Sequence, residues 1–108
     1  MSGEVSRTGQ YAVIFPNQRT SEDGEGYGAM AERMVELAAE QPGFCGIDST
    51  RGEDGFGITV SYWDSLEAIE AWRDQAEHLE AQRLGRKRWY HSFDVHIAKI
   101  DRSYTFSK

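Results

Sequence analysis

The chain has 108 residues, with 12 basic and 18 acidic side chains, and its formal net charge of −6 argues against nucleic acid as a partner. The length suits a single domain over residues 1–108, and no apolar run approaches the roughly 18 residues that a membrane span needs. A single cysteine, Cys45, and an N-terminus without an apolar signal segment predict a cytoplasmic protein.

A strand and a helix are predicted in the first forty residues. The segment QYAVIFPNQ carries apolar residues on both alternating sets, which is typical of a strand covered on both faces, and Pro16 should end it near Asn17. From Tyr27 to Glu40 apolar residues recur at steps of three and four, which predicts a helix. The polar, glycine-rich residues 18–28 between them are expected to form a flexible loop, because the acidic neighbours of the glycines would repel a phosphate.

The second half predicts a hairpin, a helix and a last strand. Residues 44–51 and 56–63 are strand-like runs, and the Asp-Gly pair between them indicates a tight turn. Asp64, three residues before a glutamate, fits the N-cap of a helix whose apolar face continues as far as Gly85. Residues 89–97 alternate as a final strand, followed by a polar-aromatic tail.

This order of elements, βαββαβ, predicts an α+β, ferredoxin-like split βαβ fold with a four-stranded antiparallel sheet. Two helices can cover only one face of such a sheet. The first and last strands nevertheless carry apolar residues on both faces. We therefore expect a homodimer in which a second subunit covers the other face.

The histidines do not predict a metal site. His91 and His96 are five residues apart in a strand and so point to opposite faces, and neither pairs at i,i+4 with His78. The basic residues 86–88 are expected to compensate the end of the second helix, although Arg86 alone could reach an anionic or phenolic ligand.

Trp72 is the aromatic side chain that best fits a ligand site. It lies on the helical stripe that should face the sheet, where core packing is the common role but where a ligand would also bind in this topology. Arg73 is adjacent to this stripe, and His78 lies about 120° from Trp72 around the helix. Tyr62 could point into the same space or into a dimer interface, because strand parity alone does not decide.

Two long blocks resemble the antibiotic biosynthesis monooxygenase family. They are MAERMVELAAEQPGFCGIDSTR and DGFGITVSYWDSLEAIEAWRDQAEHLEAQRLGRKRWY, preceded by NQR at the end of the first strand. The similarity covers about residues 11–104. It implies a core over these residues and ferredoxin-like protomers that pair into a dimeric α/β barrel. Some family members oxygenate phenols or quinols without metal or flavin, and related members bind and degrade haem.

The haem-degrading pattern matches only in part. Asn17 and Trp72 match its strand-end Asn and its helical Trp, but the position ten residues after Trp72 is Gln82 instead of the iron-binding His. The resemblance therefore favours a cofactor-independent monooxygenase that acts on a phenolic or quinol-type small molecule and O₂. A haem-binding or haem-degrading enzyme and a non-catalytic dimeric binding or stress-response module remain the alternatives.

The resemblance also implies roles for individual residues. Asn17 would hydrogen-bond the substrate oxygen and Trp72 would stack on the substrate, while His78 or Arg73 would handle the phenolic proton. The predicted catalytic residues are Asn17, Trp72 and His78, and the predicted substrate-binding residues are Tyr62, Arg73, Gln82 and Arg86.

Overall fold

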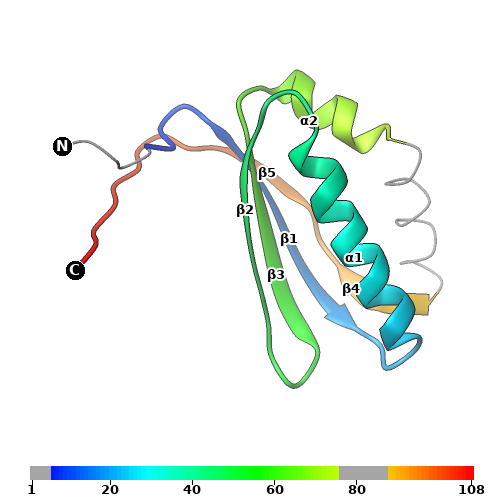
Figure 1. The fold of residues 1–108 in the computed structure, drawn as a ribbon. Coiled ribbons are helices and arrows are strands. Elements are labelled where there is room, and N and C mark those ends of the chain that lie inside the picture. Colours follow the sequence, from blue (N-terminus) through cyan, green and yellow to red (C-terminus); the bar gives the residue numbers. More distant parts are fainter. Residues whose placement is uncertain (1–5, 76–87) are drawn as a thin grey trace.

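The structure, a computed structural model, describes residues 6–75 and 88–108. In chain order the elements are β1 (Tyr11–Arg19), α1 (Gly24–Ala39), β2 (Phe44–Arg51), β3 (Phe56–Trp63), α2 (Leu66–Arg73), β4 (Tyr90–Phe93) and β5 (His96–Lys99). The strands form one antiparallel sheet in the order β2-β3-β1-β4, and β5 also pairs with β1. Both helices lie on the same side of this sheet (Figure 1). The predicted α+β, ferredoxin-like fold is confirmed.

The central strand β1 continues to Arg19, past the point near Asn17 where Pro16 was expected to end it. The Pro16 carbonyl accepts from the Asp94 amide at 3.0 Å, so the missing amide of Pro16 faces the edge of the sheet and not β3. The lost hydrogen bond therefore interrupts the edge strand and leaves β1 intact.

This interruption explains why the last predicted strand is two strands. The pairs Asn17–Phe93 and Ile14–His96 have the same offset, so β4 and β5 share one register along β1. The gap at residues 94–95 lies opposite Pro16, where no reciprocal amide bond can form.

Helix α1 begins at Gly24, three residues before the predicted start, which corrects the loop expected over residues 24–28. The cause is Asp23, whose side chain accepts from the Gly26 amide at 3.1 Å and so caps the helix. A side chain on Gly26 would displace this carboxylate, so the glycine serves the close contact with the cap and not a loop.

Helix α2 is capped by Ser65 and not by the predicted Asp64. The Ser65 hydroxyl accepts from the Ala68 amide at 3.1 Å, whereas the Asp64 amide donates to the Gly43 carbonyl at 2.9 Å. The helix ends at Arg73 with Asp74 as its C-cap, so the prediction of one unbroken helix to Gly85 is wrong at residues 74–75, and residues 76–85 lie outside the described residues. The hairpin of β2 and β3 is confirmed, with Gly55 at a φ of 87° in its turn.

The strand register separates two faces of the sheet. Alternate residues of β1, among them Val13, point toward the helices, and Val13 packs against a core formed by Ala38, Trp63, Ile69 and Trp72, called here the Trp63 core. On the helix-free face Phe56 and Ile58 are 45% and 37% exposed. No helix within the described residues is long and apolar enough to cross a membrane.

Candidate functional site

The candidate site begins at Asn17, which faces the helices near the end of β1. Its side chain is only 2% exposed, and such a buried amide needs hydrogen-bond partners. Asn17 Nδ2 donates to the Phe15 carbonyl at 3.1 Å, and Asn17 Oδ1 accepts from Arg51 Nη2 at 2.6 Å. The amide is thus held in one orientation by a charged donor.

A glycine in β3 permits this contact. Asn17 pairs with Gly57, and Gly57 pairs with Arg51 on the other side, so the three residues form a row across the sheet. A Cβ on Gly57 would lie 2.9 Å from Arg51 Cζ. The Arg51 side chain therefore reaches Asn17 because Gly57 has no side chain between them.

Tyr27, one turn after the start of α1, contacts Arg51 from the helix side of the sheet. Its hydroxyl oxygen accepts from Arg51 Nη2 at 2.9 Å and from the Tyr90 hydroxyl at 3.4 Å. The Arg19 guanidinium lies 3.9 Å from the centre of the Tyr27 ring, in cation–π geometry. Burial, followed by its hydrogen bond to Tyr27, raises the pKa of Tyr90, so this phenol remains a neutral donor. We call Asn17, Arg19, Tyr27, Arg51 and Tyr90 the Asn17 cluster.

Aromatic rings line the cluster. Phe15 contacts Tyr90 edge-on at 5.5 Å between ring centres and Phe93 at 5.4 Å. Tyr27 makes edge contacts with Trp89 at 5.7 Å and with Tyr90 at 5.8 Å. A polar centre of amide, guanidinium and phenol groups therefore lies beside apolar ring surfaces, an arrangement that suits an aromatic ligand with one polar group.

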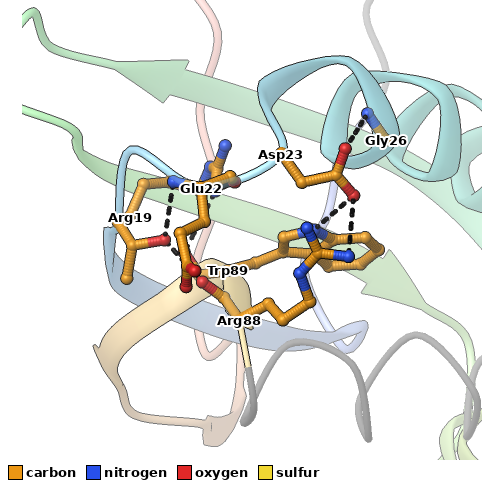
Figure 2. Close-up of polar contacts among 7 residues, drawn as sticks. Arg19, Glu22, Asp23, Gly26, Arg88 and Trp89 are labelled. Atoms are coloured by element: carbon orange, nitrogen blue, oxygen red, sulfur yellow. Dashed lines mark hydrogen bonds and ion pairs between the residues drawn. The ribbon is translucent and has the colours of Figure 1, made fainter.

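Asp23 fixes the two elements that carry the tyrosines. Figure 2 shows its carboxylate between the Gly26 amide of α1, the Trp89 indole and the Arg88 guanidinium. Trp89 Nε1 donates to Asp23 at 3.4 Å, and the Arg88 ion pair is 3.7 Å long. The start of α1 is thereby held against the start of β4.

Arg19 adds a second connection there. Arg19 Nη1 donates to the Trp89 carbonyl at 3.1 Å and to the Glu22 carbonyl at 3.4 Å (Figure 2). Within the described residues neither Arg19 nor Arg51 has a carboxylate within ion-pair distance. The cluster therefore carries a local positive charge although the whole chain is negative.

Trp72 lies away from Asn17. Its ring stacks on Trp63 with 6.0 Å between ring centres and an interplanar angle of 27°, and it is 9% exposed in the Trp63 core. Trp63 pairs with Tyr11, six residues along β1 from Asn17, which is about 20 Å of strand. The structure does not bring these two predicted catalytic residues together, and a role for Trp72 at a substrate stays a prediction.

The other predicted residues lie elsewhere. Tyr62 is on the helix-free face, where its hydroxyl donates to Asp48 at 2.9 Å and the Arg7 guanidinium lies 3.9 Å from the centre of its ring. Burial is the main cause that raises the pKa of Tyr62. Of the two orientations left open for Tyr62, the structure shows the one that points away from Asn17. Arg73 is exposed at the end of α2. His78, Gln82 and Arg86 lie outside the described residues.

Sequence reasoning missed the arginines and tyrosines of the Asn17 cluster. Tyr27 was assigned only to the apolar stripe of a helix, and Arg51 only to the end of a strand. The Asp-Gly pair alone does not give the hairpin register, because a two-residue turn at 54–55 would place Arg51 opposite Ile58. The observed loop has three residues, 53–55, closed by the Gly52 amide bond to the Phe56 carbonyl, and this extra residue places Arg51 opposite Gly57. The remaining step, the pairing of Gly57 with Asn17, depends on tertiary structure.

Within the described residues, neither a cluster of metal-binding side chains nor a surface depression indicates another functional site. No group of three or more His, Cys, Asp or Glu side chains in residues 6–75 and 88–108 could hold a metal ion. A depression of about 320 Å³ lies at the Trp63 end of the molecule and contains two carboxylates but no cationic side chain. Its lining residues are Pro42, Gly43, Asp64, Ser65, Glu67, Ala68 and Ala71.

Comparison with known proteins places the fold and the sequence in one family. The model of the antibiotic biosynthesis monooxygenase family matches residues 11–84, more than half of the chain. An uncharacterized protein of Bacillus subtilis, YqjZ, is 55% identical over 98 residues, which cover 91% of this chain and 85% of that protein.

Solved structures share the fold at low sequence identity. A conserved protein from Methanosarcina mazei is 10% identical with a TM-score of 0.77, over 87% of this chain and 95% of that chain. SnoaB, a cofactor-independent oxygenase from Streptomyces nogalater, is 14% identical with a TM-score of 0.72, over 85% of this chain and 93% of that chain. At these identities the likeness concerns the fold.

Proposed function

Because the chain belongs to the antibiotic biosynthesis monooxygenase family, we propose that it is a cofactor-independent monooxygenase acting on a phenolic or quinol-type aromatic small molecule. The observation that carries this proposal is the buried Asn17 amide, held at 2.6 Å by Arg51 beside a wall of aromatic rings. The SnoaB likeness adds an oxygenase with the same fold that needs no cofactor.

The proposed reaction needs no external reductant. The deprotonated phenol supplies the electrons: O₂ adds to a ring carbon, and loss of water from the resulting hydroperoxide leaves a quinone. One oxygen atom enters the product and the other leaves as water, so a phenol and O₂ balance a quinone and H₂O. The enzyme must therefore favour the phenolate, and a guanidinium with an oriented amide is suited to stabilise that charge.

The roles expected for the remaining predicted residues are separate proposals. His78 would accept the phenolic proton, with Arg73 as the alternative, and Gln82 and Arg86 would contact the substrate. Stacking of Trp72 on the substrate requires a molecule long enough to extend from the Asn17 cluster to the Trp63 core. If oxygen uptake continues in the Trp72→Phe variant but is lost in the Asn17→Ala variant, the role of Trp72 is core packing and not substrate binding.

The decisive experiment measures O₂ consumption by the purified protein with a panel of phenols and quinols. We expect uptake that Asn17→Ala lowers by about 10²-fold in kcat, the effect of removing one oriented donor from an oxyanion site. Ser92→Ala, at an exposed position of β4, is the matched control and should be neutral. Stoichiometric binding of a phenol with no oxygen uptake would instead indicate a binding module. A Soret band on addition of haem, lost with a reductant, would favour haem degradation.

We further propose that the protein is a homodimer joined through the helix-free face. Phe56 and Ile58 are exposed there, Tyr104 and Phe106 in the C-terminal tail are 85% and 86% exposed, and a second subunit would cover these large side chains. Light scattering at micromolar concentration should give twice the chain mass, and Ile58→Glu should give a monomer. A monomeric wild type would refute this interface.

A further inference from the structure

The hydroxyl group of Tyr27 has an unusual set of hydrogen bonds. A phenol has one O–H donor and an oxygen with two lone pairs. Arg51 Nη2 and the Tyr90 hydroxyl both donate to this oxygen, at 2.9 and 3.4 Å. Both lone pairs are therefore used, and the Tyr27 hydrogen has no acceptor within hydrogen-bond distance in residues 6–75 and 88–108.

Arg51 has two N–H groups without a partner in the described residues, one on Nε and one on Nη1, whereas both hydrogens of Nη2 are used. Of the five N–H groups of a guanidinium, three are engaged, by the Gly55 carbonyl, Asn17 Oδ1 and the Tyr27 oxygen. No carboxylate of the described residues neutralises the guanidinium. A positive charge and a free hydroxyl donor thus lie next to each other, and an anionic oxygen would satisfy both.

The Tyr27 ring cannot turn its hydroxyl away without losing several contacts. Arg19 lies over its face at 3.9 Å, and Trp89 and Tyr90 contact it edge-on. Asp23 holds both α1 and Trp89 in place (Figure 2). A donor fixed in this way costs little reorganisation when charge develops on a ligand oxygen.

We propose that the Tyr27 hydroxyl and the Arg51 guanidinium form an oxyanion-binding pair that selects the phenolate form of an aromatic ligand, with Tyr27 as the direct hydrogen-bond donor. The ligand class is an aryl oxyanion, because the pair is flanked by the Phe15, Tyr90 and Phe93 rings. This assignment rests on the proposed function, since it specifies the ionisation state in which the same site binds its substrate.

The test is a spectroscopic titration with 4-nitrophenol, whose phenol and phenolate forms absorb at different wavelengths. Wild-type protein should bind the phenolate in preference, so the apparent pKa of bound 4-nitrophenol should fall below its value in free solution. The methyl ether 4-nitroanisole, which cannot ionise, should bind at least about tenfold more weakly. Equal binding of the two compounds by the wild type would overturn the proposal without any variant.

Two tyrosine variants then isolate the donor. Tyr27→Phe keeps the ring contacts and removes the O–H, and should weaken phenolate binding by about tenfold to a hundredfold while 4-nitroanisole binding stays unchanged. Tyr104→Phe, the matched control, removes one phenolic O–H from an exposed position in the C-terminal tail, outside the Asn17 cluster, and should change phenolate binding by less than about threefold. Unaltered phenolate binding by Tyr27→Phe would overturn the assignment of Tyr27.

These outcomes are independent of turnover. Selective phenolate binding without oxygen uptake would support the oxyanion pair and sink the monooxygenase. Oxygen uptake by a protein that binds phenol and phenolate equally well would support the monooxygenase and overturn the oxyanion-binding pair.

Discussion

The layer between helices and sheet differs at its two ends. At one end Trp63 is fully buried and stacks on Trp72, with Ala38 and Ile69 completing an apolar core. At the other end Asn17 is equally buried, but its neighbours are arginines and tyrosines joined by hydrogen bonds. The same two faces, a helix surface and a sheet surface, thus enclose apolar packing at one end and directed polar groups at the other.

This difference indicates how a small chain can combine stability and a polar site. Apolar packing contributes a large part of the folding free energy and tolerates small changes in side-chain shape. A buried amide and a buried guanidinium instead cost free energy unless each of their hydrogen bonds is made. Separation by about 20 Å along β1 allows substitutions at one end to leave the other nearly unchanged. The predictions below test this independence.

The largest effect is expected at the Trp63 core. Trp63→Ala should lower the free energy of unfolding by about 3–5 kcal/mol, because a buried indole is lost and a cavity remains. Urea denaturation followed by circular dichroism measures this change. Tyr62→Ala, on the same strand but the opposite face, should cost clearly less; equal losses would show that the Trp63 core is not the main source of stability.

An intermediate effect is expected from Gly57→Ala. The added methyl would crowd Arg51 Cζ and the Thr50 carbonyl, which lies 2.7 Å from the Cβ position, so overpacking should cost about 1–3 kcal/mol. Arg51 should also be displaced from Asn17, and phenolate binding should fall with it. Unchanged binding in a stable Gly57→Ala protein would contradict the role given to this glycine.

The two helix caps provide a matched pair, one at each end. Ser65→Ala should cost about 1 kcal/mol, the usual contribution of a capping hydroxyl. Asp23→Ala should cost more, up to about 2 kcal/mol, because Asp23 also accepts from Trp89 and pairs with Arg88. Thermal unfolding of both variants measures the difference. If Ser65→Ala is the more harmful, Asp23 does not connect α1 to β4 as described.

The smallest effect is a pH dependence at the Asn17 cluster. The pKa of Tyr90 is higher in the folded protein than its ordinary value of 10, because burial and the bond to Tyr27 favour the neutral form. This contribution to stability is complete below pH 10 and is lost as the pH rises through the folded pKa. Tyr90→Phe should therefore make unfolding less sensitive to pH above 10 in urea titrations; an unchanged slope would contradict the assignment.

The sequence predicted the fold well because the fold depends on local signals. Periodicity located both helices, and the Asp-Gly pair located the hairpin. Errors arose where two residues competed for one role. Ser65, and not its neighbour Asp64, is the N-cap of α2. Asp23 is the N-cap of α1, so the helix includes three glycines that were expected to lie in a loop.

The site was less predictable because it depends on cross-strand pairing and on a helix crossing a sheet. Asn17 was proposed from a family resemblance, but its partner Arg51 and the Tyr27 that Arg51 also binds are 34 and 10 residues away and carry no local motif. Trp72 met the periodicity expected of a site residue because a core residue has the same periodicity. Pattern alone does not separate those two roles.

Pro16 has a consequence for how the sheet opens. At the gap between β4 and β5 the Asp94 amide still bonds to the Pro16 carbonyl, but the reciprocal bond is absent because Pro16 has no amide hydrogen. Backbone bonds hold the outer ends of both strands: the Thr20 amide bonds to the Trp89 carbonyl next to β4, and the Ile100 amide bonds to the Gln10 carbonyl next to β5. One absent amide in the central strand therefore weakens the sheet edge in its middle, so local opening of this edge should begin at residues 94–95 and not at its outer ends.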